Sequence, residues 1–243
     1  MEIFTLAVIK GGTGKTTTCA ALAQAAVLKG KRVLAIDLDP QANLTFTLNA
    51  DLRLPGSYEL LNGVAARKLI QQTSQHMGVI AASANLSTET TFRGSATRLK
   101  TALEDVQDWY DYIFIDTPPT IGEITFNALM ASTGLIIPLE SDSQSIQGLY
   151  HITDIAQQIQ KTNPALSIKG ILLTRFDSRA KINQYLKDVL QEKAKELGTN
   201  FLGTVRNGIA IREAQARRAN LFEDSPKSHV AEDYLAIYEK LFS

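Results

Sequence analysis

The chain has 243 residues, of which 44% are hydrophobic and 21% charged, and its formal net charge is zero. This balance is typical of a globular domain and gives no sign of a membrane or nucleic-acid partner. The one cysteine, Cys19, excludes an intramolecular disulfide framework and an all-cysteine zinc site. No apolar run reaches the length of about 18 residues that a membrane span needs, and no basic segment of a signal peptide follows Met1.

Short, continuously apolar runs alternate with longer helical patterns along the chain. Such runs are typical of strands that are buried on both faces of a sheet. We expect strands over residues 3–9, 32–36, 77–81, 112–115, 135–139, 168–173 and 201–205. Apolar residues at spacings of three and four predict helices over residues 16–29, 146–159, 182–197 and 230–242.

The alternation of strand and helix predicts the fold class. Repeated strand–helix–strand units are right-handed and form a parallel sheet. We therefore expect an α/β fold with a single doubly wound, mostly parallel sheet and helices on both faces. We expect one domain over residues 1–243, with Gly30 ending the first helix. Ligands of such sheets bind at the carboxyl ends of the strands.

A segment rich in glycine and lysine joins the first expected strand to the first expected helix. It is close to the phosphate-binding pattern G-x-x-x-x-G-K-[ST], although Ile9 stands at the first glycine of that pattern. The glycines allow backbone N–H groups to converge on phosphate oxygens at the helix N-terminus. In the pattern, Lys15 reaches the β- and γ-phosphates and the Thr16 hydroxyl ligates Mg²⁺. The predicted loop consists of Lys10, Gly11, Gly12, Thr13, Gly14, Lys15, Thr16 and Thr17.

Three aspartates stand at or just beyond the ends of expected strands. Asp116 follows a buried apolar run, where an unpaired carboxylate is costly. The water shell of a magnesium ion would satisfy it. Asp37 and Asp39 follow the second expected strand. For Asp37 the sequence leaves open a functional carboxylate or one that is only hydrogen-bonded at the strand end.

Four segments together resemble the deviant-Walker P-loop ATPases of the ParA/MinD family. The loop is similar to that family's K-G-G-x-G-K-T. Residues 37–43 resemble its D-x-D-P-Q-G-N segment, with Ala42 in place of glycine. Residues 113–119 resemble its Walker B segment. Residues 205–214 resemble its P-R-N to E-A segment near the adenine, with Val205 in place of proline.

This resemblance implies a slow, Mg²⁺-dependent ATP hydrolase that forms a homodimer on binding ATP. It implies that Lys10 crosses the dimer interface to the partner's phosphates and that Asp39 positions or activates the attacking water. Arg206 and Asn207 would lie beside the nucleotide. The expected catalytic residues are therefore Lys10, Lys15 and Asp39; the nucleotide site adds the loop residues, Arg206 and Asn207; the metal site consists of Thr16 and Asp116.

The branch of the family depends on cysteines, on the tail and on local charge. The lone Cys19 excludes the iron–sulfur relatives. The acidic residues of segment 232–243 disfavour a MinD-like membrane helix, and its apolar residues are expected to pack on the core. Residues 175–218 contain ten Lys/Arg and five Asp/Glu, an excess of five positive charges. This excess indicates either a DNA-facing surface or only the solvated faces of helices.

The charge excess fits the short ParA/Soj branch, whose members bind DNA non-specifically. Because the chain begins at its first strand, we expect no N-terminal helix-turn-helix domain. The resemblance implies a cytoplasmic, nucleoid-associated protein that partitions plasmid or chromosomal DNA with a ParB-like centromere-binding partner and without a membrane. The alternatives are a ParA-like scaffold that positions a protein cargo and a MinD-like membrane-cycling regulator. The candidate DNA contacts are Arg179, Lys181, Arg206, Arg212, Arg217 and Arg218.

Overall fold

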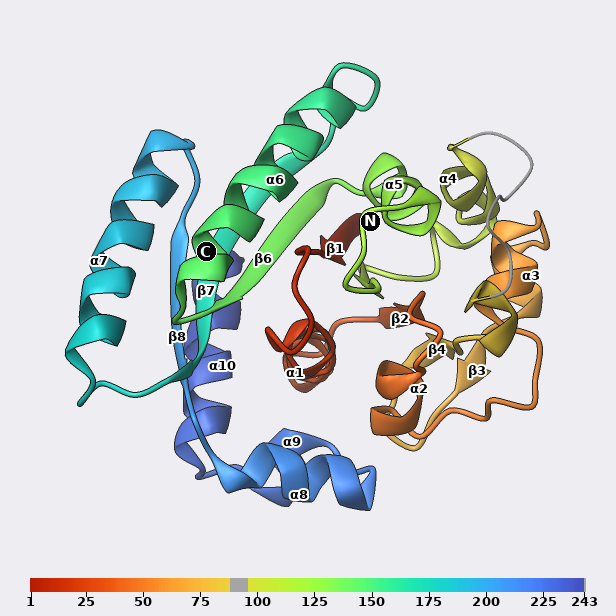
Figure 1. Ribbon diagram of the computed structural model, residues 1–243. Coiled ribbons are helices and arrows are strands. Elements are labelled where there is room, and N and C mark those ends of the chain that lie inside the picture. Colours follow the sequence, from red (N-terminus) through yellow and green to blue (C-terminus); the bar gives the residue numbers. More distant parts are fainter. Residues whose placement is uncertain (88–95, 243) are drawn as a thin grey trace.

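The computed structural model describes residues 1–87 and 96–242, which form one eight-stranded sheet with helices on both faces (Figure 1). The strand order is β3-β4-β2-β5-β1-β6-β7-β8. Every neighbouring pair is parallel except β3 and β4. The prediction of a mostly parallel, doubly wound sheet is confirmed. The strands are β1 (Glu2–Leu6), β2 (Val33–Asp37), β3 (Gln71–Gln72), β4 (Gly78–Ile80), β5 (Tyr112–Asp116), β6 (Gly134–Glu140), β7 (Ser167–Phe176) and β8 (Phe201–Arg206).

Helices of very different length cover the sheet. The longer helices of the described chain are α1 (Lys15–Leu28), α5 (Glu123–Ala131), α6 (Ser143–Gln160), α7 (Lys181–Glu196), α8 (Ile209–Arg217) and α10 (His229–Leu241). The short helices are α2 (Asn43–Thr47), α3 (Ser57–Leu61), α4 (Arg98–Ala102) and α9 (Leu221–Asp224), and the 3-10 turns are η1 (Ala66–Lys68), η2 (Ala84–Ser87) and η3 (Glu104–Val106).

Alternating side chains of the strands pack against different helix layers. In β1, Phe4 and Leu6 join the core formed with α1, α9 and α10, whereas Ile3 joins the core formed with α3, α4 and α5. A third cluster packs α6 and α7 against β6 and β7. Because both faces are covered, the strands are continuously apolar, as the sequence indicated.

The C-terminal helix α10 packs its apolar face on the core. Val230, Ala231, Tyr234, Ile237 and Tyr238 are buried and belong to the cluster that includes α1 and β8. This confirms the prediction for the apolar residues of the tail. None of the helices in the described chain combines the length and the apolar character needed to cross a bilayer.

Several boundaries differ from the sequence-based expectations. The first strand ends at Leu6 and not at Ile9, because the chain there leaves the sheet to form the phosphate loop. The short strand β3 and the helices α2, α3, α4, α5, α8 and α9 were not predicted. The four predicted helices agree with α1, α6, α7 and α10 to within three residues at each end. Gly30, with φ +75°, follows the helix cap Lys29.

Candidate nucleotide site

The loop between β1 and α1 has the backbone of a phosphate cradle. Gly12 and Gly14 both have φ +81°, a left-handed conformation that glycine adopts at little cost. A Cβ atom on Gly14 would lie 3.2 Å from Cγ2 of Thr174. Lys15, the first residue of α1, folds back so that its Nζ donates a hydrogen bond to the Lys10 carbonyl at 3.0 Å. Burial lowers the pKa of Lys15. The negative charges of Asp116 and Asp39 raise this pKa, but by less than burial lowers it.

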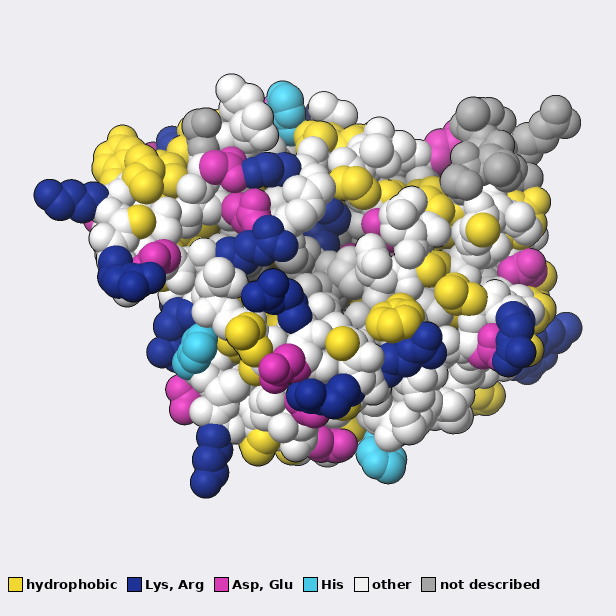
Figure 2. Space-filling model, turned by 60° about the horizontal axis from the view of Figure 1, so that its bottom comes forward, with side chains coloured by type: hydrophobic (Ala, Val, Ile, Leu, Met, Phe, Trp, Pro, Cys, Tyr) yellow, Lys and Arg dark blue, Asp and Glu magenta, His cyan; other side chains and the backbone are white. Residues whose placement is uncertain are grey.

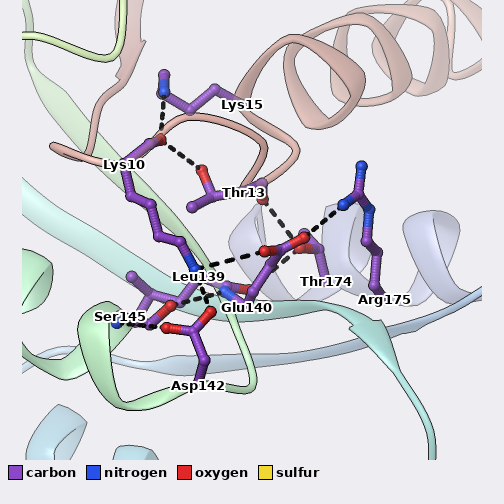
Figure 3. Close-up of polar contacts among 9 residues, drawn as sticks. All are labelled: Lys10, Thr13, Lys15, Leu139, Glu140, Asp142, Ser145, Thr174 and Arg175. Atoms are coloured by element: carbon purple, nitrogen blue, oxygen red, sulfur yellow. Dashed lines mark hydrogen bonds and ion pairs between the residues drawn. The ribbon is translucent and has the colours of Figure 1, made fainter.

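Thr174 fastens this loop to the sheet. Its hydroxyl lies 2.9 Å from the carbonyl oxygen of Thr13 and 3.1 Å from that of Leu139 (Figure 3). Thr174 is buried at the carboxyl end of β7, next to β6. The hydroxyl therefore links the loop to two strands, a positioning role that no sequence motif signalled.

Asp116 and Asp37 lie side by side at the carboxyl ends of β5 and β2. Asp116 is fully buried; its Oδ2 accepts a 2.6 Å hydrogen bond from the Thr16 hydroxyl, and its Oδ1 has no partner among the described residues. Burial, with the nearby charge of Asp37, raises the pKa of Asp116 well above its usual value. Burial also raises the pKa of Asp37 to about 6.

The two carboxylates differ in how well they are satisfied. Asp37 accepts hydrogen bonds from the Asp39 N–H at 3.1 Å, from the Thr45 N–H at 2.8 Å and from the Thr45 hydroxyl at 2.7 Å. These bonds favour a hydrogen-bonded strand-end carboxylate, one of the two possibilities left open for Asp37. Asp116 keeps a buried oxygen to which no described residue donates, so its carboxylate is the one that needs a ligand.

The residues at this point fit a hard cation. Mg²⁺ prefers oxygen ligands, keeps several waters and is often bound by only one or two protein groups together with phosphates. The Thr16 hydroxyl and Oδ1 of Asp116 supply such oxygens next to the phosphate loop. Among the described residues, no group of three or more His, Cys, Asp and Glu could hold a metal ion.

Two contiguous cavities surround the loop. The first has a volume of about 490 Å³ and is lined by most of the loop together with Asp39, which is 7% exposed and accepts a 2.9 Å hydrogen bond from the Gln41 N–H. The second has a volume of about 340 Å³, and Arg206 and Asn207 line it. Each has room for part of a small ligand. The residues that line both cavities are Gly14, Thr17, Arg175 and Gln215.

Arg175 stands at the junction of these cavities and was missed by the sequence analysis. Its backbone has φ +52°, an uncommon conformation for a residue other than glycine and a frequent feature of functional sites. Its guanidinium contacts Glu140 at 2.7 Å. Apart from its charge, nothing in the sequence marks this position.

The Lys10 side chain points away from the phosphate loop and toward the carboxyl end of β6 in the same subunit. Figure 3 shows it directed at two acidic residues at and beyond the end of β6. Its Nζ forms a hydrogen-bonded ion pair with Asp142 and lies 3.6 Å from Oε2 of Glu140. Lys10 is thus close to the nucleotide site but engaged by carboxylates.

Three of the six candidate DNA contacts are already paired. Arg179, Arg206 and Arg217 contact Asp177, Asp233 and Asp224 at 3.1, 2.8 and 2.7 Å.

The other three candidates are less engaged. Within residues 1–87 and 96–242, no carboxylate lies at ion-pair distance from Lys181, Arg212 or Arg218. Arg218 stacks on the Phe46 ring, with its guanidinium carbon 4.1 Å from the ring centroid. Figure 2 shows basic side chains around the central hollow, with acidic ones between them.

Comparisons with known proteins find similar partitioning ATPases. A family model described as an AAA domain matches residues 1–168. The chromosome-partitioning ATPase Soj of Thermus thermophilus is 30% identical over 235 residues, which cover 96% of this chain and 92% of that protein. The chromosome partitioning protein ParA of Myxococcus xanthus is 34% identical over 242 residues, 96% of this chain and 84% of that protein.

One similar solved structure contains an ATP analogue and magnesium. Cobyrinic acid a,c-diamide synthase from Mycobacterium smegmatis, with a bound ATP analogue and magnesium, superposes with a TM-score of 0.79. It is 30% identical to this chain, and the match covers 98% of this chain and 93% of that one.

Proposed function

This chain belongs to the ParA/Soj family of ATPases, and we propose that it is a Mg²⁺-dependent partition ATPase that dimerises on ATP and then binds DNA without sequence specificity. The observation that carries the nucleotide part is the buried carboxylate of Asp116 at the phosphate loop: its Oδ2 accepts a hydrogen bond from the Thr16 hydroxyl, and its Oδ1 receives none from any described residue. A nucleotide-bound magnesium ion with its waters would satisfy that oxygen.

The residues around the two cavities divide the work of phosphoryl transfer. Lys15 would bind the β- and γ-phosphates, and Thr16 and Asp116 would hold Mg²⁺, which would supply positive charge to the phosphates. Asp39, on the wall of the larger cavity, orients the attacking water. Lys10 supplies a further positive charge to the phosphates of a second subunit. Because a lone subunit lacks that charge, dimerisation controls hydrolysis.

The residues that bind the rest of the nucleotide lie in the smaller cavity. Arg206 and Asn207 line it, and Arg175 joins it to the phosphate side. A base and a ribose placed there would lie next to the phosphate loop, because Gly14 and Thr17 of the loop line both cavities. The M. smegmatis structure, which is 30% identical over almost the whole chain and contains an ATP analogue and magnesium, supports nucleotide binding by this chain.

DNA binding is proposed for the basic residues that have no carboxylate partner in the described chain. A cation that must first release a carboxylate contributes less to a phosphate contact, so Lys181, Arg212 and Arg218 are the foremost candidates. Each neutralised phosphate releases counterions, and a dimer places two such surfaces on one duplex. Binding should therefore require ATP, weaken steeply with salt and differ little between sequences. A ParB-like partner would act together with the ATPase when it binds and releases DNA.

Fluorescence anisotropy with two unrelated duplexes, in ATP and in ADP, tests the DNA part. Lys181→Glu and Arg218→Glu should weaken binding to both duplexes and lower the salt slope by about 1 for each phosphate that is no longer neutralised. Lys68→Glu, an exposed lysine of η1, is the matched control and should bind as the wild type does. Equal binding in ATP and ADP, or none in either, would contradict partition and favour a protein-positioning scaffold or a membrane-cycling regulator.

A further inference from the structure

Lys10, for which we propose a role at a second subunit, forms ion pairs within its own subunit. Its side chain is 23% exposed, and its Nζ is shared between Asp142 and Glu140. The two carboxylates lie at and just beyond the end of β6 beside the phosphate loop, where the parallel order of β1 and β6 brings them next to Lys10. The ammonium group therefore has two negative neighbours before any nucleotide phosphate approaches.

Asp142 is well fixed for holding this lysine. It is the N-cap residue of α6, and its Oδ1 accepts a 2.9 Å hydrogen bond from the Ser145 N–H. The capping bond fixes the carboxylate, and its other oxygen, Oδ2, contacts Lys10 (Figure 3). One side chain thus begins a helix and binds the first lysine of the loop.

Glu140 would keep one cationic partner, Arg175, if Lys10 moved away from it. Its Oε1 contacts Arg175 at 2.7 Å, whereas its Oε2 lies 3.6 Å from Lys10. Departure of Lys10 would therefore leave Asp142 as the carboxylate without a cation. The contact between Lys10 and Asp142 is the one that must be broken.

Lys10 cannot remain on Asp142 and also reach the phosphates of a second subunit. We propose that Asp142, supported by Glu140, is a positioning residue that holds Lys10 in the resting subunit and so sets the ATP concentration at which the protein dimerises. This inference rests on the proposed function, since it assumes that Lys10 acts on a partner's phosphates. Both subunits must release their lysine, so the effect counts twice in the dimer.

Asp142→Asn separates the charge from the cap. Asparagine is as good an N-cap residue as aspartate, so the Ser145 bond and α6 remain while the negative charge is removed. The control is Asp154→Asn, which removes the same charge from an exposed position of the same helix. Far-ultraviolet circular dichroism should give the same helix content for both variants and the wild type.

Sedimentation velocity with ATP and Mg²⁺ measures the effect, in an Asp39→Ala background that is expected to keep ATP intact. A partly exposed ion pair contributes up to about 1 kcal/mol, which is about fivefold per subunit. With two subunits, Asp142→Asn should strengthen dimerisation by up to about twenty-five-fold and lower the ATP concentration at the midpoint of dimerisation. The difference in ATP midpoint between Asp142→Asn and the wild type should become smaller as the salt concentration rises, because salt screens the ion pair between Lys10 and Asp142. Asp154→Asn should follow the wild type at every salt concentration.

Three results would overturn the inference. The first is an ATP midpoint of Asp142→Asn equal to that of the wild type. The second is a decrease of the ATP midpoint in Asp154→Asn equal to that in Asp142→Asn. The third is a raised ATP midpoint in Asp142→Asn, which would mean that Asp142 stabilises the dimer. Lys10→Ala distinguishes this failure from failure of the proposed function. If Lys10→Ala hydrolyses ATP normally, the role of Lys10 is wrong; if it is inactive while Asp142→Asn behaves as wild type, only the holding role of Asp142 is wrong.

Discussion

Replacing Asp116 by asparagine should stabilise the nucleotide-free protein and abolish its response to magnesium. Asparagine has the same shape and can still accept the hydrogen bond from Thr16. It removes a negative charge that is fully buried and lies next to a second buried carboxylate, Asp37. The substitution should therefore stabilise the protein without nucleotide and weaken its binding of magnesium with ATP.

The raised pKa values make this effect depend on pH. A carboxyl with a raised pKa stabilises the fold below the unfolded value of about 4, and this stabilisation is lost as the pH rises through the folded value. For Asp37, whose pKa is raised to about 6, the loss at pH 7 is about 3 kcal/mol. The pKa of Asp116 is shifted in the same direction. The stability of the wild-type protein without nucleotide should therefore begin to fall at about pH 4, with most of the loss from Asp37 complete by about pH 6, and Asp116 should add to the fall.

Thermal unfolding at pH 7 without nucleotide measures the gain. Removal of a desolvated buried charge contributes about 1–3 kcal/mol, and each kcal/mol shifts the Tm of a chain of this length by about 2–4 °C. Asp116→Asn should therefore melt about 2–12 °C higher. Its stability should also depend less on pH. Asp108→Asn, which removes an exposed charge from the loop before β5, should leave the Tm almost unchanged.

The same assay with ATP completes the test. A ligand at a hundred times its Kd stabilises a protein by about 2.7 kcal/mol. The wild-type protein should gain this amount in ATP with Mg²⁺ and less in ATP with a chelator. Asp116→Asn should show little difference between the two conditions. A lower Tm without nucleotide, or a magnesium response equal to that of the wild type, would refute the assignment of Asp116.

The remaining predictions concern the loop and the dimer. Lys15→Ala should weaken ATP binding at least about tenfold by isothermal titration; unchanged affinity would contradict the loop assignment. Lys10→Ala should bind ATP without hydrolysing it, and Asp39→Ala should remain dimeric in ATP, so a strictly monomeric Asp39→Ala protein would contradict the sandwich dimer. Thr174→Val keeps the shape but removes a donor from two backbone carbonyls, and should destabilise the fold by about 1–3 kcal/mol; an unchanged Tm would contradict its role in fastening the loop.

Local patterns in the sequence were sufficient for the apolar strands, for four of the six longer helices of the described chain and for the position of the loop between β1 and α1. The buried strands and the helices α1, α6, α7 and α10 have clear apolar runs or periods, and the loop has its own glycine and lysine chemistry. The two polar residues of β3, Gln71 and Gln72, and the five residues of α2 contain no such period. Their conformation depends on the neighbouring strand and helices, so the sequence could not indicate it.

Only the tertiary structure decided which groups meet at the site. The sequence predicted functional roles for Lys10, Thr16 and Asp116. It did not indicate that Lys10 pairs with Asp142, 132 residues later, or that Thr16 bonds to Asp116, 100 residues later. Likewise, charge counting could not tell Arg206, which pairs with Asp233, from Arg212, which has no carboxylate partner in the described chain. The physical reason is that strand order brings β1 between β5 and β6. Electrostatic and hydrogen-bonding partners depend on distance in space, which a one-dimensional pattern of charges and glycines does not contain.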